Sequence, residues 1–294
     1  MNRPYIEFKK RRDFGLLLSD TFGFLRNEFK PFLKTILTIS GPSLVLFIVA
    51  MTFYTYTVGD IFNFDIYGGN DVDLSNSLMI IASAFLYLIS VILTLIFVSS
   101  SALHYIKSYV ENSGDVVFED VKRNVSKTFW GYLGLGILKY ITLFFALILC
   151  FFPVLYAMVP MFIVFSIYVF ENRRGATDAY SYSFYLINED FWLALGSIIV
   201  LFILMYVLSL VFSIPSVIYT YAKMGIFSGE IDPESLNSLV DPVYILLNVL
   251  STLFSILLNL ISIIASALLY FHLNEKRNFT GTYERITNIG KIEE

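Results

Sequence analysis

Two adjacent carboxylates are the first residues in this sequence that suggest chemistry. Glu189 and Asp190 lie in SFYLINEDFW (183–192), among aromatic residues. A carboxylate pair can act as general acid and base when both side chains meet one substrate. Adjacent helical residues point to different faces, however, and no histidine, nucleophile or metal ligand lies nearby in the sequence. We therefore interpret the pair as the polar break before a membrane span, with Ser183 capping a helix or turn.

A near-copy of this segment lies far upstream, at TFGFLRNEF (21–29). Both copies begin with Ser or Thr followed by Phe, and both end in an acid followed by Phe. A weaker third version is VSKTFWGYL (125–133). Each version precedes an apolar stretch. We therefore expect three units, each an amphipathic segment followed by a helical hairpin, at roughly 1–103, 104–170 and 171–273.

The segment around the first copy has the spacing of an amphipathic helix. Its apolar face consists of Phe14, Leu18, Phe22, Leu25, Phe29 and Phe32. A basic, Phe-rich helix beside a span is expected in the plane of the lipid headgroups. Phe22 and Phe29 should then be buried against lipid or against the floor of the helix bundle. Trp130 and Trp192 are expected to anchor later spans at the membrane surface.

Lys139 is the only charged residue within a predicted span. An intramembrane lysine is a functional candidate by default. Its long side chain can also reach the headgroups and contact lipid phosphates. No carboxylate lies in any predicted span to pair with it, so both interpretations stay open.

Polar side chains follow one face of the last predicted span. Small hydroxylated residues let helices pack closely, so the stripe indicates a packing seam in which the asparagines bond across to another helix. The alternative is a polar cavity that admits a solute or a lipid headgroup. The candidate binding residues are Asn248, Thr252, Ser255, Asn259 and Ser262, and Ser266 continues the stripe.

The metal and redox chemistry of the chain is restricted by its composition. There are two histidines, His104 and His272, and each is expected to end a span at the membrane surface. With Glu275 they would form a poor metal site. The single cysteine, Cys150, excludes a disulfide within the chain. We expect no metal, no cofactor and no catalytic residue.

The elements that position these residues follow from hydropathy. The chain has 294 residues, of which 57% are hydrophobic and 15% charged, against about 25% charged in soluble domains. Its mean hydropathy is +0.71. These values predict an all-α, polytopic membrane protein. The net charge of −4 gives no reason to expect binding to nucleic acid.

Six transmembrane helices are expected, preceded by a cytoplasmic amphipathic segment at 1–34 and followed by a cytoplasmic tail at 274–294. Proline breaks a helix interior, so Pro153 separates the third span from the fourth. The short fourth span leaves a re-entrant hairpin as an alternative. The spans lie within 35–273, at about 35–58, 78–103, 131–152, 154–170, 192–221 and 242–273.

The basic residues predict the orientation. If both termini are cytoplasmic, Lys223 is the only one of the 20 Lys and Arg residues outside, and Lys139 lies within a span. Arg173 and Arg174 form the third cytoplasmic segment. The two outer loops are acidic instead. This distribution predicts a bacterial inner-membrane protein with both termini in the cytoplasm.

Three stretches carry a resemblance to a known family: RRDFGLLLSDTFGFLRNEFKPFLK, SYSFYLINEDFW and NEKRNFTGTYERITNIG. Together they resemble the six-helix membrane domain that accompanies some bacterial glycerophosphodiester phosphodiesterases, and its stand-alone relatives. The resemblance covers about residues 11–290. The phosphodiesterase half is not found in this sequence, so the resemblance implies a fold and a membrane but no reaction.

The leading functional hypothesis is a non-enzymatic inner-membrane scaffold or accessory subunit. Its expected partners are the lipid bilayer and other membrane proteins or further copies of itself. The alternative is a permease or exporter component that handles a small solute or lipid, motivated by the polar stripe and Lys139. An intramembrane hydrolase ranks third, because the sequence contains no nucleophile, base and metal set.

Overall fold

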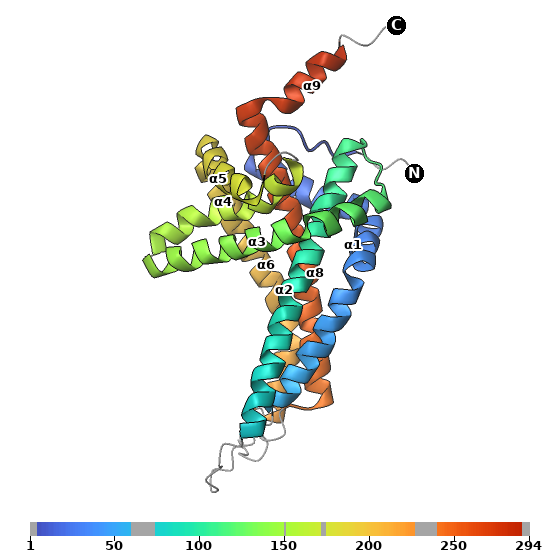
Figure 1. Cartoon of the computed structure of the whole chain (residues 1–294), viewed down its shortest axis with the longest axis vertical. Coiled ribbons are helices and arrows are strands. Elements are labelled where there is room, and N and C mark those ends of the chain that lie inside the picture. The colour runs from blue at the N-terminus through green and yellow to red at the C-terminus, as the bar shows by residue number, and fades with distance from the viewer. Residues whose placement is uncertain (1–4, 60–73, 150, 172–174, 227–239, 290–294) are drawn as a thin grey trace. The chain divides into compact units, whose positions relative to one another are not determined.

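The computed structural model describes residues 5–59, 74–149, 151–171, 175–226 and 240–289. Every element in these ranges is a helix, which confirms the all-α fold (Figure 1). Most of both acidic outer loops, and Arg173 and Arg174, lie outside the described residues. The helices are α1 (Phe14–Gly59), α2 (Leu74–Glu111), α3 (Phe118–Leu149), α4 (Phe151–Phe170), α5 (Ala176–Leu186), the 3-10 helix η2 (Ile187–Glu189), α6 (Phe191–Lys223), α8 (Pro242–Asn278) and α9 (Thr280–Ile289).

Six of these helices, α1, α2, α3, α4, α6 and α8, are long and apolar enough to cross a membrane, which confirms a multi-pass protein. Several extend well beyond the predicted spans. Because α1 begins at Phe14, the predicted amphipathic segment and the first span form one continuous helix. Residue 34 is therefore not a helix boundary: helical apolar spacing continues on both sides of it. In the same way, α3 begins at Phe118 and includes the third amphipathic segment.

The break between the third and fourth spans lies slightly before the predicted position. α3 ends at Leu149 and α4 begins at Phe151, so Pro153 lies in the first turn of α4. Proline is tolerated there because the first N–H groups of a helix have no partner within the helix. α3 and α4 run side by side, and α5 packs against both (Figure 1).

The chain divides into two compact units. Unit A comprises Met1–Ile39, Ile96–Ile203 and Leu260–Glu294, and unit B comprises Ser40–Leu95 and Leu204–Asn259. Each of α1, α2, α6 and α8 contributes one part to each unit.

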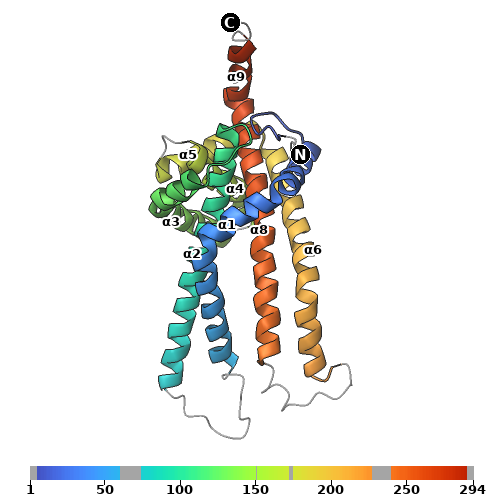
Figure 2. The same ribbon diagram turned by 90° about the vertical axis from the view of Figure 1, so that its right-hand side faces the viewer.

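Unit B consists of membrane-length helical segments. Its parts of α1 and α2 run side by side, as do its parts of α6 and α8 (Figure 2). Phe47 and Met51 of α1 are buried with Val249 of α8. Phe212 of α6 stacks on Phe254 of α8, with ring centroids 4.3 Å apart.

Asp241 joins the ends of α6 and α8 in unit B. One of its oxygens accepts the backbone N–H of Tyr244 at 2.8 Å, and so caps α8. The other accepts a hydrogen bond from Lys223 at 2.7 Å. Slight burial opposes ionisation, but the hydrogen bonds from Lys223, Tyr219 and Tyr244 outweigh it and lower the pKa of Asp241 to about 2.

Aromatic side chains form much of the core of unit A. Phe24 of α1 meets Phe8 of the N-terminal segment and Tyr109 of α2 edge-on, at centroid distances of 5.3 and 5.1 Å. Phe32 meets Tyr105 in the same way at 5.1 Å. Such edge-to-face pairs add to the free energy gained from burial alone. They fix residues 5–13 against α1 and α2.

Candidate functional site

The second copy of the repeated segment ends in a polar junction between η2 and α6. Oδ2 of Asp190 accepts hydrogen bonds from Lys276 Nζ at 2.8 Å and from His272 Nε2 at 3.3 Å. Glu189 accepts one from Arg277 at 2.7 Å. Both carboxylates therefore bind the C-terminal part of α8. The interruption of the helix here confirms the interpretation of the pair as a polar break.

Ser183 does not cap a helix or turn, contrary to our prediction. It lies inside α5, is fully buried, and its hydroxyl donates to the carbonyl oxygen of Tyr180 at 2.7 Å. A serine within a helix commonly bonds a carbonyl one turn back in this way. The sequence pattern did not distinguish that arrangement from a cap.

His272 connects the junction to the N-terminal segment. The backbone N–H of Arg12 donates to His272 Nδ1 at 2.9 Å. A nitrogen that accepts this bond carries no proton, so the imidazole is neutral and its Nε2–H donates to Asp190. His272 therefore holds residues from three parts of the sequence together.

The Arg12 side chain is buried, with only 3% of the residue exposed. Its guanidinium donates to Asp20 Oδ2 at 2.9 Å and to backbone carbonyls of the N-terminal segment. Burial lowers the pKa of Arg12, while the hydrogen bond and the charge of Asp20 oppose that effect. At Asp190, partial burial raises the pKa, but hydrogen bonds from Lys276 and His272 outweigh it and hold the pKa below its usual value.

Glu275 binds the N-terminus of α9. Its carboxylate accepts the backbone N–H groups of Gly281 at 2.6 Å and of Thr282 at 3.0 Å. A negative charge at a helix N-terminus is stabilising because the first N–H groups lack partners. Glycine is required at position 281, since a Cβ there would lie 2.3 Å from the carbonyl oxygen of Lys9.

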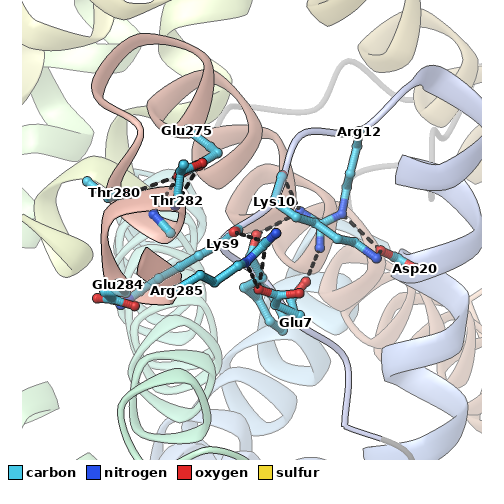
Figure 3. A network of polar contacts seen from close by, with 12 residues as sticks. Glu7, Lys9, Lys10, Arg12, Asp20, Glu275, Thr280, Thr282, Glu284 and Arg285 are labelled. Carbon is cyan, nitrogen blue, oxygen red and sulfur yellow. Dashed lines mark hydrogen bonds and ion pairs between the residues drawn. The ribbon is translucent and has the colours of Figure 1, made fainter. Parts of the chain in front are cut away.

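Figure 3 shows how the N-terminal segment is fixed to α9. Arg285 donates to Glu7 at 2.8 Å, and Lys9 pairs with Glu284. We call the whole set of contacts the terminal network. Its members are Glu7, Lys9, Lys10, Arg12, Asp20, Glu189, Asp190, His272, Glu275, Lys276, Arg277, Glu284 and Arg285.

The terminal network has a structural role, because its polar groups bind one another. Its acids and bases are paired with one another, and the carboxylates of Asp190 and Glu275 are occupied by hydrogen-bond donors. Among the described residues, no three His, Cys, Asp or Glu side chains gather as metal ligands would. The network therefore holds the N-terminal segment, the α5–α6 junction and α9 in one arrangement.

The first copy of the repeat has two apolar faces. Leu17, Phe24 and Phe32 are fully buried in unit A, whereas Phe22 and Phe29 are exposed. The prediction that Phe22 and Phe29 are buried against the floor of the helix bundle is therefore wrong. Their contact with lipid stays a prediction. The apolar face predicted from the sequence combined residues of the buried and the exposed face, because phenylalanine occurs on both.

The two predicted tryptophan anchors are also exposed. Trp130 is 76% exposed and Trp192 80% exposed. Each follows a phenylalanine whose ring meets it edge-on, Phe129 at 5.3 Å and Phe191 at 5.4 Å. Their role at the membrane surface stays a prediction.

Lys139 lies between α3 and α4. Its ammonium is 5.1 Å from the centroid of the Phe165 ring, which itself stacks on Tyr132 at 4.2 Å. An aromatic face attracts a cation. This contact supplies a partner that the sequence did not indicate, but it does not decide between lipid contact and a functional site.

The predicted polar stripe of α8 has three different environments. Ser255 lies 3.4 Å from Ser209 of α6 in unit B, and Ser266 lies 3.0 Å from Ser166 of α4 in unit A. The hydroxyl of Thr252 donates to a carbonyl of its own helix at 2.8 Å. The hydroxyls of Ser255 and Ser266 therefore contact neighbouring helices, whereas that of Thr252 bonds its own helix.

The asparagines of the stripe do not follow the seam prediction. Asn248 donates to the carbonyl of Tyr244, one turn back in α8, at 3.1 Å, and so does not bond across to another helix. Asn259 is half-buried, and neither it nor Ser262 has a side-chain hydrogen bond within the described part of the chain. Asn259 is therefore the one amide of the stripe that has no hydrogen-bond partner among the described residues.

One ion pair of the terminal network, and the separation of the two histidines, were missed in the sequence. The sequence pattern did not indicate that Arg12 and Asp20 form an ion pair, in which the Arg12 side chain is fully buried and the Asp20 side chain is partly exposed. His104 and His272 do not meet, since His104 bonds Thr128 at 3.0 Å and His272 bonds Asp190. One signal in the sequence could have predicted the contact between α8 and the α5–α6 junction. Two acids precede Trp192, and two basic residues, Lys276 and Arg277, end the last span.

Comparisons of this sequence and structure with protein-family models, curated proteins and solved structures found no match. The resemblance to the membrane domain that accompanies phosphodiesterases therefore stays a prediction.

Proposed function

We propose that this protein is a non-enzymatic scaffold or accessory subunit of a complex in the bacterial inner membrane, with both termini in the cytoplasm. The observation that carries the proposal is an apolar face of α3 that no other described element covers. The face has helical spacing of i, i+3, i+4, i+7, i+8 and i+11, and all of its residues are exposed: Ile137, Tyr140, Ile141, Phe144, Phe145 and Ile148.

Two further observations support a scaffold. The opposite side of the α3–α4 hairpin is packed against α5, so the hairpin presents its free face outward from unit A. Aromatic residues such as Phe144 and Phe145 are enriched in the buried cores of protein–protein interfaces. The terminal network holds the N-terminal segment, the α5–α6 junction and α9 of unit A in a fixed arrangement, as a docking platform requires.

The test is photocrosslinking in native membranes. A photoreactive residue at Phe144 or Ile148 is expected to join the chain to the same protein of defined mass. Phe85, an exposed residue of α2 in unit B, is the matched control position and should yield mainly lipid adducts. If all three positions yield only lipid adducts, the scaffold proposal is wrong.

The permease alternative is favoured by one residue, Asn259. After replacement of Cys150 by Ser, a cysteine at position 259 should be labelled by a water-soluble thiol reagent if a wet pathway passes it. A scaffold predicts no labelling there. A cysteine at Asp115, exposed between α2 and α3, is the orientation control: it should react in inverted vesicles and not in intact cells.

A further inference from the structure

A polar pocket of about 300 Å³ lies in unit A, between the end of α2, the start of α3 and the end of α4. It is separate from the stripe of α8 and from the terminal network. Its lining residues are His104, Lys107 and Glu111 of α2, Asn124 and Thr128 of α3, and Tyr168 and Val169 of α4.

Hydrogen bonds between helices fix the walls of this pocket. Lys107 is 8% exposed, and its ammonium donates to the carbonyl of Val169 at 2.8 Å. His104 is 3% exposed and lies 3.0 Å from the Thr128 hydroxyl. That hydroxyl donates its one hydrogen to the carbonyl of Asn124 at 2.8 Å, so His104 Nε2 is the donor to Thr128. The pocket is therefore preformed.

The pocket lies at a level of α3 where a lipid headgroup is expected. Thr128 in its wall is two residues from Trp130, which is exposed, and tryptophan prefers the boundary between headgroups and acyl chains. Immediately beyond Trp130, α3 becomes apolar. A ligand that reaches the pocket from the bilayer would present its polar group here.

The lining offers one positive and one negative charge. Lys107 and Glu111 are one turn apart on the same face of α2, about 6 Å along the helix axis. Lys107 is buried in the wall, whereas Glu111 is exposed at the rim. An anionic ligand alone would face the Glu111 carboxylate, and a cationic ligand alone would face the Lys107 ammonium.

We propose that this pocket binds the headgroup of an aminophospholipid. The phosphodiester, with its single negative charge, lies toward Lys107, and the ammonium group lies toward Glu111. Tyr168 and Asn124 add an O–H and an N–H donor for the phosphate oxygens. Tyr168 occupies this place because Gly131 has no side chain: a Cβ there would lie 2.0 Å from the tyrosine hydroxyl oxygen.

The experiment measures lipid selectivity and does not depend on the scaffold proposal. The full chain is placed in nanodiscs of equal parts phosphatidylethanolamine and phosphatidylglycerol, and the retained lipid is counted by native mass spectrometry after extraction. The wild type should retain phosphatidylethanolamine preferentially. Glu111→Gln removes the partner of the ammonium and should reduce the preference about tenfold, the effect of losing one charge-assisted hydrogen bond.

Glu119→Gln is the matched control, because Glu119 is an exposed acid in the first turn of α3 outside the pocket lining. It should retain the wild-type preference, and both variants should melt at the wild-type temperature. Equal retention of the two lipids by the wild type, or an unchanged preference in Glu111→Gln, would overturn the proposal. The proposal would also be overturned if free phosphoethanolamine raised the melting temperature as much as phosphatidylethanolamine does. That result would assign the pocket to a water-soluble compound.

Discussion

The two copies of the repeated segment, 21–29 and 183–191, place equivalent residues in equivalent environments within different backbones. Thr21 and Ser183 are both fully buried, and each bonds a carbonyl of its own helix at 2.7 Å. Near the end, Glu28 accepts a hydrogen bond from Tyr105 at 2.9 Å, as Asp190 does from Lys276. The first copy nevertheless lies inside the continuous helix α1, whereas the second is interrupted at η2.

The residue types at the end of each copy account for this difference. The first ends in Arg-Asn-Glu, and Glu28 has a high helix propensity. The second ends in Asn-Glu-Asp, and Asp190 adopts φ −158° and ψ 55°, outside the helical region. Aspartate competes with the helix for backbone hydrogen bonds and favours the position before a helix. The carboxylate at this position thus accepts a hydrogen bond from a distant helix in both copies, and we expect the choice of Glu or Asp to determine whether the helix continues.

The largest effect is expected from removal of the second carboxylate. Asp190→Ala leaves Lys276 and His272 without their acceptor and should reduce the free energy of unfolding by about 3 kcal/mol, the upper range for hydrogen bonds to a charged group. Thermal unfolding followed by the fluorescence of nearby Trp192 measures the loss. Asp115→Ala, at an exposed acid, is the control and should change the melting temperature little.

Acid dependence gives a second readout of the same variant. The pKa of folded Asp190 lies below its usual value, so the carboxylate stabilises the fold fully above the unfolded value of about 3.9. That contribution is lost as the pH falls toward the lower folded pKa. Asp190→Ala should lack this part of the acid-induced loss of stability. An unchanged acid profile would show that the ion pairs at Asp190 contribute nothing.

A smaller effect is expected at the first copy. Tyr105→Phe removes the hydroxyl that donates to the buried Glu28 carboxylate and should reduce the free energy of unfolding by about 1.5 kcal/mol. Tyr140→Phe, at an exposed tyrosine of α3, is the matched control. If both variants melt alike, the carboxylates of the two copies are not equivalent in function.

The smallest effect is expected from exchange of the two acids. Asp190→Glu retains the negative charge but favours a helix, so it should cost about 1 kcal/mol in altered contacts to Lys276. Hydrogen exchange of residues 187–194 should slow, because a continuous helix would protect amides that η2 leaves at a helix end. The reciprocal Glu28→Asp should leave exchange within α1 unchanged. Unaltered exchange at 187–194 would place the cause of the break elsewhere.

Much of the fold followed from the sequence because its determinants are local. The apolar stretches indicated six helices of membrane-crossing length, and the proline after the third span indicated a break close to the observed end of α3 at Leu149 and start of α4 at Phe151. The adjacent acids Glu189 and Asp190 before Trp192 likewise predicted the interruption between α5 and α6. Hydropathy, length and proline act within one or two helical turns, so a sequence window contains them.

Only the tertiary structure decided which polar residues are buried and what they contact. Arg12 can be buried because both of its donor groups have acceptors. Its backbone N–H donates to His272, 260 residues away, and its guanidinium donates to Asp20. Burying a charge is costly unless its partners are in place, and those partners come from distant segments. The same holds for the Phe-rich segment: all its phenylalanines favour burial, but packing against α2 selected Phe24 and Phe32 and left Phe22 and Phe29 outside.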